Sequence, residues 1–252
     1  MVVFTNLTKV FLFPIYYLIH HNIIFGYLQK FVIKMFYYKR FKFKLKNLGI
    51  PLSHYSSFLF NTYEYNDRKL VENHLSEKNK CIIIGGGLGF IPVLVYHKTK
   101  NKIIVSEINK KIIPNLKNNL KLNKCEFSLL NNNIKIEKFK NKIENFYFST
   151  SFIDTSKYIK TKKILKFKNI NINKIKNFKN FNTLIIDGEG IEEYFIKNIN
   201  KIKSIKEIIF ELHYNIFNKF EANNLFSILE KNGFEKVDSC FNSFYFKKNK
   251  LS

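Results

Sequence analysis

The feature that most constrains this chain is an apolar run that ends in a cluster of glycines, CIIIGGGLG at residues 81–89. Four apolar residues that stop at glycine predict a buried strand entering a tight turn, and the apolar residues 90–96 predict a helix after it. Such a turn brings backbone N–H groups up to a ligand, because glycine has no Cβ and adopts positive φ freely. We therefore expect four glycines to bind a cofactor: Gly85, Gly86, Gly87 and Gly89.

The glycine spacing excludes two common phosphate-binding turns. A P-loop requires Lys and then Ser or Thr after its last glycine, but Phe90 and Ile91 follow Gly89. The dinucleotide fingerprint requires Gly or Ala three positions after its second glycine, where Phe90 stands, so a nicotinamide-dependent reductase is disfavoured. Glycines at 85, 87 and 89 suit the tighter turn that binds a nucleoside-linked methyl donor. A turn without a ligand is the alternative.

A second strand-like run, residues 102–107, ends in an acid that could bind a nucleoside. Glu107 lies 22 residues after Gly85, close to the spacing of about 20 residues at which a carboxylate at a strand end reaches ribose hydroxyls. Glu107 is therefore our ribose-binding candidate, with Ile108 beside it in the cofactor site. The alternative is a solvated acid just beyond a strand.

The rest of the chain alternates short apolar runs with helical patterns. We expect strands at 81–85, 103–107, 126–130, 183–187 and 206–212, with helices at 67–75, 89–97, 109–122, 191–198 and 217–231 between them. Residues 234–239 and 242–247 predict a terminal antiparallel hairpin. This alternation predicts an α/β fold whose mostly parallel sheet carries helices on both faces. Ligands then bind beyond the carboxyl ends of the strands.

Acids and a histidine gather at two of these strand ends. Asp187, Glu189 and Glu192 surround the end of one strand, and Glu211 and His213 end the next. We expect Asp187, Glu189, Glu211 and His213 to share one catalytic cleft, because crowded carboxylates and histidine suit proton transfer. The alternatives are a structural His213–Glu211 pair and, for Glu192 and Glu193, simple complements to a helix dipole. A divalent metal on these oxygens is a further alternative that we do not predict.

These motifs together resemble the FkbM-type S-adenosylmethionine-dependent methyltransferases. Asp187-Gly-Glu-Gly-Ile-Glu resembles the Asp-x-Glu-Gly-x-Glu signature of that family. The resemblance covers about residues 61–247, and further matches lie in the same order: Tyr63-Glu64, Gly85 and Gly89, Glu107, the Leu116/Asn119/Leu122/Asn123 helix, and Glu211-Leu-His213. It implies a class I methyltransferase (Rossmann-like) fold with S-adenosylmethionine as cofactor. It also implies methyl transfer to a hydroxyl of a glycan or small metabolite, which would be the partner molecule.

Two positions depart from the family pattern. The acid two residues before the first glycine is Ile83 here, and the lysine two residues before the signature aspartate is Ile185. The contact to the amino end of the donor must then come from elsewhere, with Glu64 as our cofactor-binding candidate. Either change would alter donor binding or activity, so an inactive membrane-associated scaffold of the same fold stays an alternative.

The N-terminal part differs from the rest in composition. Residues 9–38 are apolar but interrupted by polar residues and Pro14, and a basic, aromatic stretch follows up to residue 46. We expect residues 1–50 to form a helical extension that either contacts an anionic membrane through residues 9–46 or packs on the main domain. Residues 51–252 would form the methyltransferase domain, with an insertion around 131–180 that covers the site.

The net charge of +24 raises the alternative of an RNA methyltransferase. Only Arg40 and Arg68 are arginines among 43 basic residues, whereas nucleic-acid sites rely on arginine forks. We therefore expect nucleic acid not to be the partner. The three isolated cysteines, Cys81, Cys125 and Cys240, form no metal-ligand pattern and indicate a reduced cytoplasmic location, where the protein either is free or lies at the inner face of the membrane.

Overall fold

The computed structural model describes residues 35–45, 57–58, 61–139, 143–148, 155–156, 164–188 and 190–249. The expectations for residues 1–34, which include most of the apolar N-terminal segment, lie outside the described residues. Among the described helices, none has the length and apolar character needed to span a bilayer.

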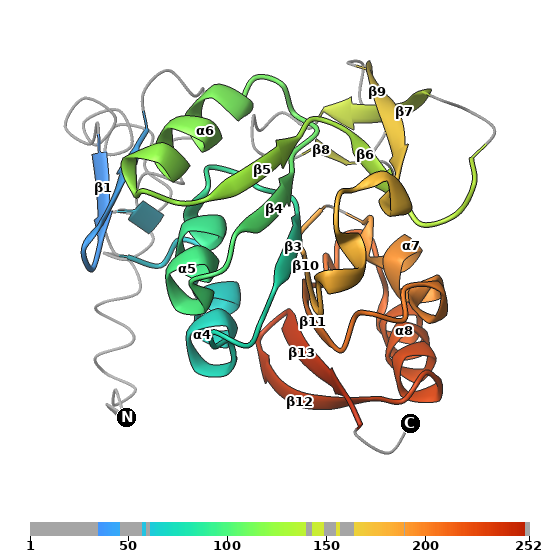
Figure 1. The fold of residues 1–252 in the computed structure, drawn as a ribbon. Helices are drawn as coiled ribbons and strands as arrows, with labels where there is room; N and C mark the ends of the chain where they lie inside the picture. The colour runs from blue at the N-terminus through green and yellow to red at the C-terminus, as the bar shows by residue number, and fades with distance from the viewer. Residues whose placement is uncertain are drawn as a thin grey trace, which may run out of the picture.

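A seven-stranded sheet forms the centre of the molecule (Figure 1). Its strands, in spatial order, are β5 (Phe127–Leu130), β4 (Ile103–Ser106), β3 (Cys81–Ile84), β10 (Thr183–Ile186), β11 (Glu207–Glu211), β13 (Ser243–Lys248) and β12 (Phe234–Cys240). Neighbours from β5 to β11 pair in parallel, and β13 is antiparallel to both β11 and β12. This is the class I methyltransferase topology, which confirms the predicted fold and its antiparallel C-terminal hairpin.

The helices form one layer on each face of the sheet. α4 (Tyr65–His74), α5 (Phe90–Thr99) and α6 (Ile113–Leu122) lie on one face, and α7 (Glu192–Lys197) and α8 (Lys219–Lys231) lie on the other (Figure 1). Residues of β3 alternate between the two cores: Ile83 packs with the first layer, and Ile82 and Ile84 with the second. A strand buried on both faces reads as a continuous apolar run, which is why the sequence shows this element clearly.

The basic, aromatic stretch before residue 46 is a β-hairpin, so the expectation that it belongs to a helical extension was wrong. β1 (Met35–Tyr38) pairs with β2 (Phe41–Lys44). In β2 and the residue after it, Phe41, Phe43 and Leu45 are buried while the intervening lysines are exposed. This is the period-two pattern of a half-buried strand.

Two asparagines of α6 hold the hairpin to the main domain. The Lys44 N–H donates to Asn119 Oδ1 at 2.7 Å, and the Lys42 N–H donates to Asn123 Oδ1 at 3.1 Å. Both asparagines also donate to the carbonyl groups of the same two lysines. The side-chain amides of these two asparagines thus bond to the backbone of β2 as a neighbouring strand would. The buried residues of the hairpin belong to the same core as α4, α5 and α6.

The segment between β5 and β10 builds a second, four-stranded sheet. Its strands are β6 (Asn133–Lys135), β9 (Ile164–Asn171), β7 (Ile143–Phe148) and β8 (Thr155–Ser156), in that spatial order. The segment around 131–180 that we expected to be an insertion therefore contributes a sheet of its own. The expected cover over the site is not seen in the described part of 131–180, because no residue of it lines the cavity described below.

Candidate active site

A cavity of about 460 Å³ lies where the parallel strands end. Its wall combines the start of α4, the glycine turn after β3, the end of β4 and the ends of β10 and β11. The described lining residues are Ser57, Thr62, Tyr63, Glu64, Tyr65, Asn66, Asp67, Gly85, Gly87, Glu107, Asp187, Glu211 and His213. The cavity therefore contains both the predicted donor-binding and the predicted catalytic positions.

The glycine turn follows β3 directly and requires glycine for two different reasons. Gly85 has φ +88°, and a Cβ there would lie 1.7 Å from the Asp187 carbonyl oxygen, so the β3 and β10 backbones could not approach. Gly87 has φ +48°, and a Cβ there would meet only Glu64 Oε1, at 3.6 Å. Gly87 therefore borders the open cavity, whereas Gly86 and Gly89 are not among its lining residues and Gly89 is the N-cap of α5.

Glu107 at the end of β4 binds the glycine turn. Its Oε2 accepts the N–H groups of Gly86 at 3.1 Å and Gly87 at 3.0 Å, and its Oε1 accepts the Asn109 N–H at 2.7 Å. Burial raises the pKa of the carboxyl, and these donors oppose that shift. Glu107 lines the cavity and is only 7% exposed, so its contact with ribose remains a prediction. Ile108 does not line the cavity; its carbonyl accepts from the Asn131 amide.

Glu64 faces the glycine turn across the cavity. It is the N-cap of α4 in the left-handed conformation, with φ +47°, so the helix starts two residues before the range 67–75 that we expected. Burial, reinforced by the charges of Asp67 and Glu211, raises the pKa of Glu64 to about 8. Ile83 is buried within β3 between Ile185 and Val105, which leaves Glu64 as the acid nearest the turn on this side.

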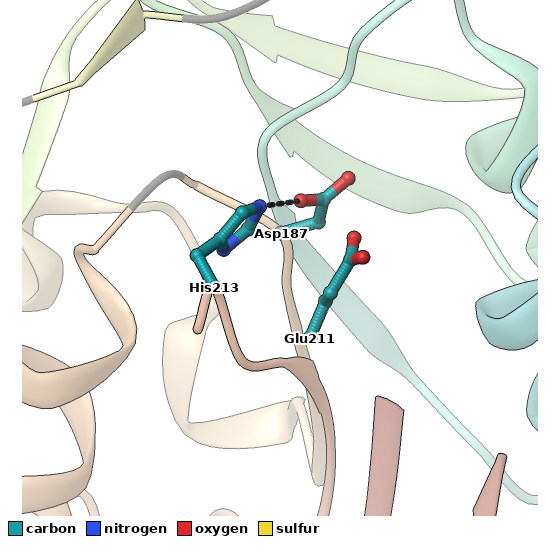
Figure 2. A group of neighbouring side chains, drawn as sticks. All are labelled: Asp187, Glu211 and His213. Atoms are coloured by element: carbon teal, nitrogen blue, oxygen red, sulfur yellow. Dashed lines mark ion pairs between the residues drawn. The ribbon is translucent and has the colours of Figure 1, made fainter. Parts of the chain in front are cut away.

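Asp187, Glu211 and His213 converge in the wall of the same cavity. One ligand atom from each lies within 4.8 Å of the other two, and Figure 2 shows the two carboxylates and the imidazole pointing toward a common space. His213 Nε2 is 3.6 Å from Asp187 Oδ1. Burial and the charge of Glu211 raise the pKa of Asp187 well above its ordinary value. The structure brings these three predicted residues together, and their catalytic role stays a prediction; Glu189 lies outside the described residues.

Glu192 belongs to this cluster in addition to lying in the first turn of α7, where an acid complements the helix dipole. Its side chain is 0% exposed, and Oε1 lies 3.2 Å from His213 Nδ1. The same oxygen accepts the Gly188 N–H at 3.1 Å. Glu192 therefore fixes the imidazole ring and directs Nε2 toward the cavity. The sequence signal was its position one helical turn beyond the acidic strand end, where a side chain can face back toward that end.

Asp67 is a second functional candidate that the sequence reasoning missed. It is 4% exposed and lines the cavity. Burial, followed by the charge of Glu211, raises the pKa of Asp67 to about 7. Asp67 stands three residues after Glu64, which places both acids on one face of the helix start. That spacing is present in the sequence, but we had treated residue 67 only as the first position of a helix.

Comparisons with known proteins find similarity at the level of structure. No family model matches the chain, and a search of curated proteins finds no match. A solved structure of TYW2 from M. jannaschii in complex with AdoMet is 14% identical, with 85% of this chain and 86% of that chain covered and a TM-score of 0.47. TYW2 from P. horikoshii in complex with MeSAdo is 12% identical over 84% and 68% of the two chains, with a TM-score of 0.46. The ribosomal protein L11 methylase from Lactobacillus delbrueckii subsp. bulgaricus is 11% identical over 73% and 77%, with a TM-score of 0.43. Conclusions about chemistry therefore rest on the residues of this chain.

Proposed function

We propose that this protein is an S-adenosylmethionine-dependent O-methyltransferase that acts on a hydroxyl of a glycan or small metabolite. The observation that carries the proposal is one cavity whose wall combines the glycine turn after β3 with the carboxylate–imidazole cluster of Asp187, Glu211 and His213. The class I topology supports it, because ligands of such sheets bind beyond the carboxyl ends of the strands. The FkbM-type motif supports the oxygen acceptor.

The donor would lie across the ends of β3 and β4. Gly87 leaves space for it, Glu107 lies beside the ribose position, and Glu64 faces the turn where the amino group of the donor would need an acid. The cavity is strongly acidic, with Glu64, Asp67, Asp187 and Glu211 in its wall. This charge suits a donor that carries a sulfonium and an ammonium group.

Methyl transfer is an in-line displacement, so the main task of the protein is to align the acceptor oxygen with the methyl carbon. The oxygen–carbon bond forms, the carbon–sulfur electron pair returns to sulfur, and the hydroxyl loses a proton. Asp187, Glu211 and His213 are the groups that would hold the hydroxyl during this step, since they line the same cavity as the glycine turn.

Two measurements test the proposal. Calorimetry with S-adenosylmethionine tests donor binding, and the absence of any binding heat would favour the inactive scaffold. A radiolabelled methyl-transfer assay against cell-envelope glycan fractions tests the acceptor class, with RNA as the parallel acceptor. Label found in RNA alone would overturn the glycan assignment and favour the RNA methyltransferase.

The hairpin supports a further part of the proposal, namely a peripheral contact with an anionic surface. Lys39, Arg40, Lys42 and Lys44 are exposed on β1, β2 and their turn, and cations near an anionic leaflet each contribute about 1 kcal/mol to binding. Binding of the full chain to vesicles with and without phosphatidylserine tests this contact. Equal binding to both vesicles would contradict it.

A further inference from the structure

The donor-set chemistry of Asp187, Glu211 and His213 suits a divalent cation. Two carboxylates and one imidazole each offer a ligand atom within 4.8 Å of the others (Figure 2). Asp187 comes directly after β10 and Glu211 ends β11, so paired parallel strands hold the two carboxylates side by side. This rigid placement is what a metal site requires of its scaffold.

The distance between His213 and Asp187 is too long for a hydrogen bond, but it fits two ligands of one metal ion. His213 Nε2 and Asp187 Oδ1 are 3.6 Å apart, beyond the usual hydrogen-bond range. Two ligand atoms that each lie about 2.1 Å from one ion are about 3.0 to 3.6 Å apart, depending on the angle between them. An ion between the residues would need only small side-chain movements.

Neighbouring groups orient two of the three ligands. Glu192 Oε1 lies 3.2 Å from His213 Nδ1, which reproduces the carboxylate–histidine–metal arrangement typical of metal sites. The Asn242 side-chain amide donates to Glu211 Oε1 at 2.5 Å. The imidazole Nε2 lies toward Asp187, 3.6 Å from Oδ1.

Asp67 supplies an independent sign that a cation is bound here. Its side chain is 96% buried, lines the same cavity, and its Oδ1 has no hydrogen-bond partner among the described residues. An unpartnered buried oxygen is costly unless a ligand satisfies it. The net single positive charge of S-adenosylmethionine is small beside the four acids of the cavity wall, whereas a divalent ion adds two charges at the acidic end.

The geometry points to a divalent-cation site formed by Asp187, Glu211 and His213, with Mn²⁺ as the best-suited ion. Oxygen ligands suit Mg²⁺ and Mn²⁺ alike, and the imidazole favours the transition metal. Three protein ligands leave positions open on the cavity side, where the acceptor hydroxyl can bind. The role of the ion in this inference rests on the proposed function. The binding of the ion does not.

An ion at this position would allow the acceptor hydroxyl to react without the His213 imidazole acting as its base. A cation held by Asp187, Glu211 and His213 would lower the pKa of a hydroxyl that binds it, which would favour loss of the hydroxyl proton to water and leave the oxygen as the nucleophile. That oxygen then forms its bond to the methyl carbon as the carbon–sulfur bond breaks. The products are the methyl ether and the neutral thioether of the donor.

The test measures Mn²⁺ binding to the full chain after EDTA treatment and removal of the chelator. Calorimetry and the electron paramagnetic resonance signal of free Mn²⁺ should both report one saturable site, and Mn²⁺ should raise the melting temperature. Glu211→Gln keeps an oxygen for Asn242 but loses the charge, so its Mn²⁺ affinity should fall about 100-fold. Glu230→Gln, an exposed carboxylate on α8, should bind as the wild type does.

Two outcomes would overturn the inference: no saturable Mn²⁺ site, or equal affinity in the wild type and Glu211→Gln. If Glu211→Gln does not fold, as judged by its melting transition without metal, His213→Gln takes its place with the same expectation. Calorimetry with S-adenosylmethionine on the metal-free protein separates the two proposals. Donor binding without Mn²⁺ binding rejects only the metal site, and Mn²⁺ binding without donor binding rejects only the methyltransferase.

Discussion

Glu107 Oε2 accepts the backbone N–H of Gly87 at 3.0 Å, and this bond joins the end of β4 to the turn after β3. The same oxygen accepts the N–H of Gly86. An acid that we selected as a ribose ligand therefore also holds the turn on which the donor would lie. Donor binding and local stability should depend on this one carboxylate.

Replacing Glu107 by Gln tests that dependence. The amide can keep its oxygen toward Gly86 and Gly87, but its NH₂ group then faces the Asn109 N–H, which loses its acceptor. We expect the free energy of unfolding to fall by about 1.5–3 kcal/mol, the range for hydrogen bonds to charged groups, and donor affinity to fall with it. Urea unfolding and calorimetry measure the two effects. Glu126→Gln, at an exposed position before β5, is the control and should change stability by less than about 0.5 kcal/mol.

Alanine at Gly87 should weaken donor binding without unfolding the protein. Its φ of +48° costs an L-residue about 1 kcal/mol, and the new Cβ would enter the cavity opposite Glu64. Alanine at Gly85 should instead prevent folding, since its Cβ would lie 1.7 Å from a backbone oxygen. Thermal melting and donor calorimetry on both variants distinguish these effects. Unchanged donor affinity in Gly87→Ala would show that the donor does not pass the turn.

The sheet could be predicted because each of its central strands is buried on both faces. Runs such as residues 81–84 and 183–186 are almost entirely apolar and are followed by glycine or an acid. The sequence therefore predicted both that these runs are strands and where each strand ends. Parallel order then brought Asp187 and Glu211 together by topology alone. The same logic placed the glycine turn beside them.

The hairpin and the buried acids could not be predicted as readily. Residues 35–44 alternate in burial, but their mixture of basic and aromatic residues suggested a surface-binding helix. Glu192 and Asp67 lie at helix starts, where acids are usually solvated dipole complements. Only the neighbouring strand ends, contributed by distant parts of the chain, turn these two acids toward His213 and Glu211.

His213→Ala should separate chemistry from donor binding. The imidazole lies beside Asp187 and Glu192 and is not one of the predicted donor-binding residues, so donor affinity should change by less than about threefold. Turnover should fall about 10²- to 10⁴-fold, whether the ring binds an ion or takes the proton directly. A single-turnover methyl-transfer assay with saturating donor measures the rate. Unchanged turnover would remove His213 from the mechanism.

Glu72 should make the hairpin attachment sensitive to acid. It accepts from Tyr38 Oη at 2.7 Å and from Lys39 Nζ at 2.9 Å. Burial acts to raise the pKa of Glu72, but these two donors outweigh it and leave the pKa below its ordinary value. A lowered folded-state pKa stabilises the protein above the unfolded-state pKa of about 4.3. That stabilisation is lost as the pH falls through the folded value.

The corresponding measurement compares the wild type with Glu72→Gln by urea unfolding at several pH values. At pH 7 the variant should be less stable by about 1 kcal/mol, and the difference should shrink as the pH is lowered below about 4.3. Tyr38→Phe removes one donor and keeps the carboxylate, so it should retain part of the pH dependence. A difference that is constant from pH 7 to pH 3 would contradict the assignment.

Phe241→Gly should stabilise the protein although it removes a large side chain. Phe241 lies in the two-residue turn between β12 and β13 with φ +52°, and its side chain is 85% exposed. Left-handed backbone costs an L-residue about 1–2 kcal/mol, of which the greater unfolded-state freedom of glycine cancels a part. Urea unfolding should therefore show a net gain of about 0.5–1 kcal/mol. Phe241→Ala keeps the Cβ and the strain, so it should show no such gain, and an equal gain in both variants would mean that the exposed ring rather than the backbone is the source of the cost.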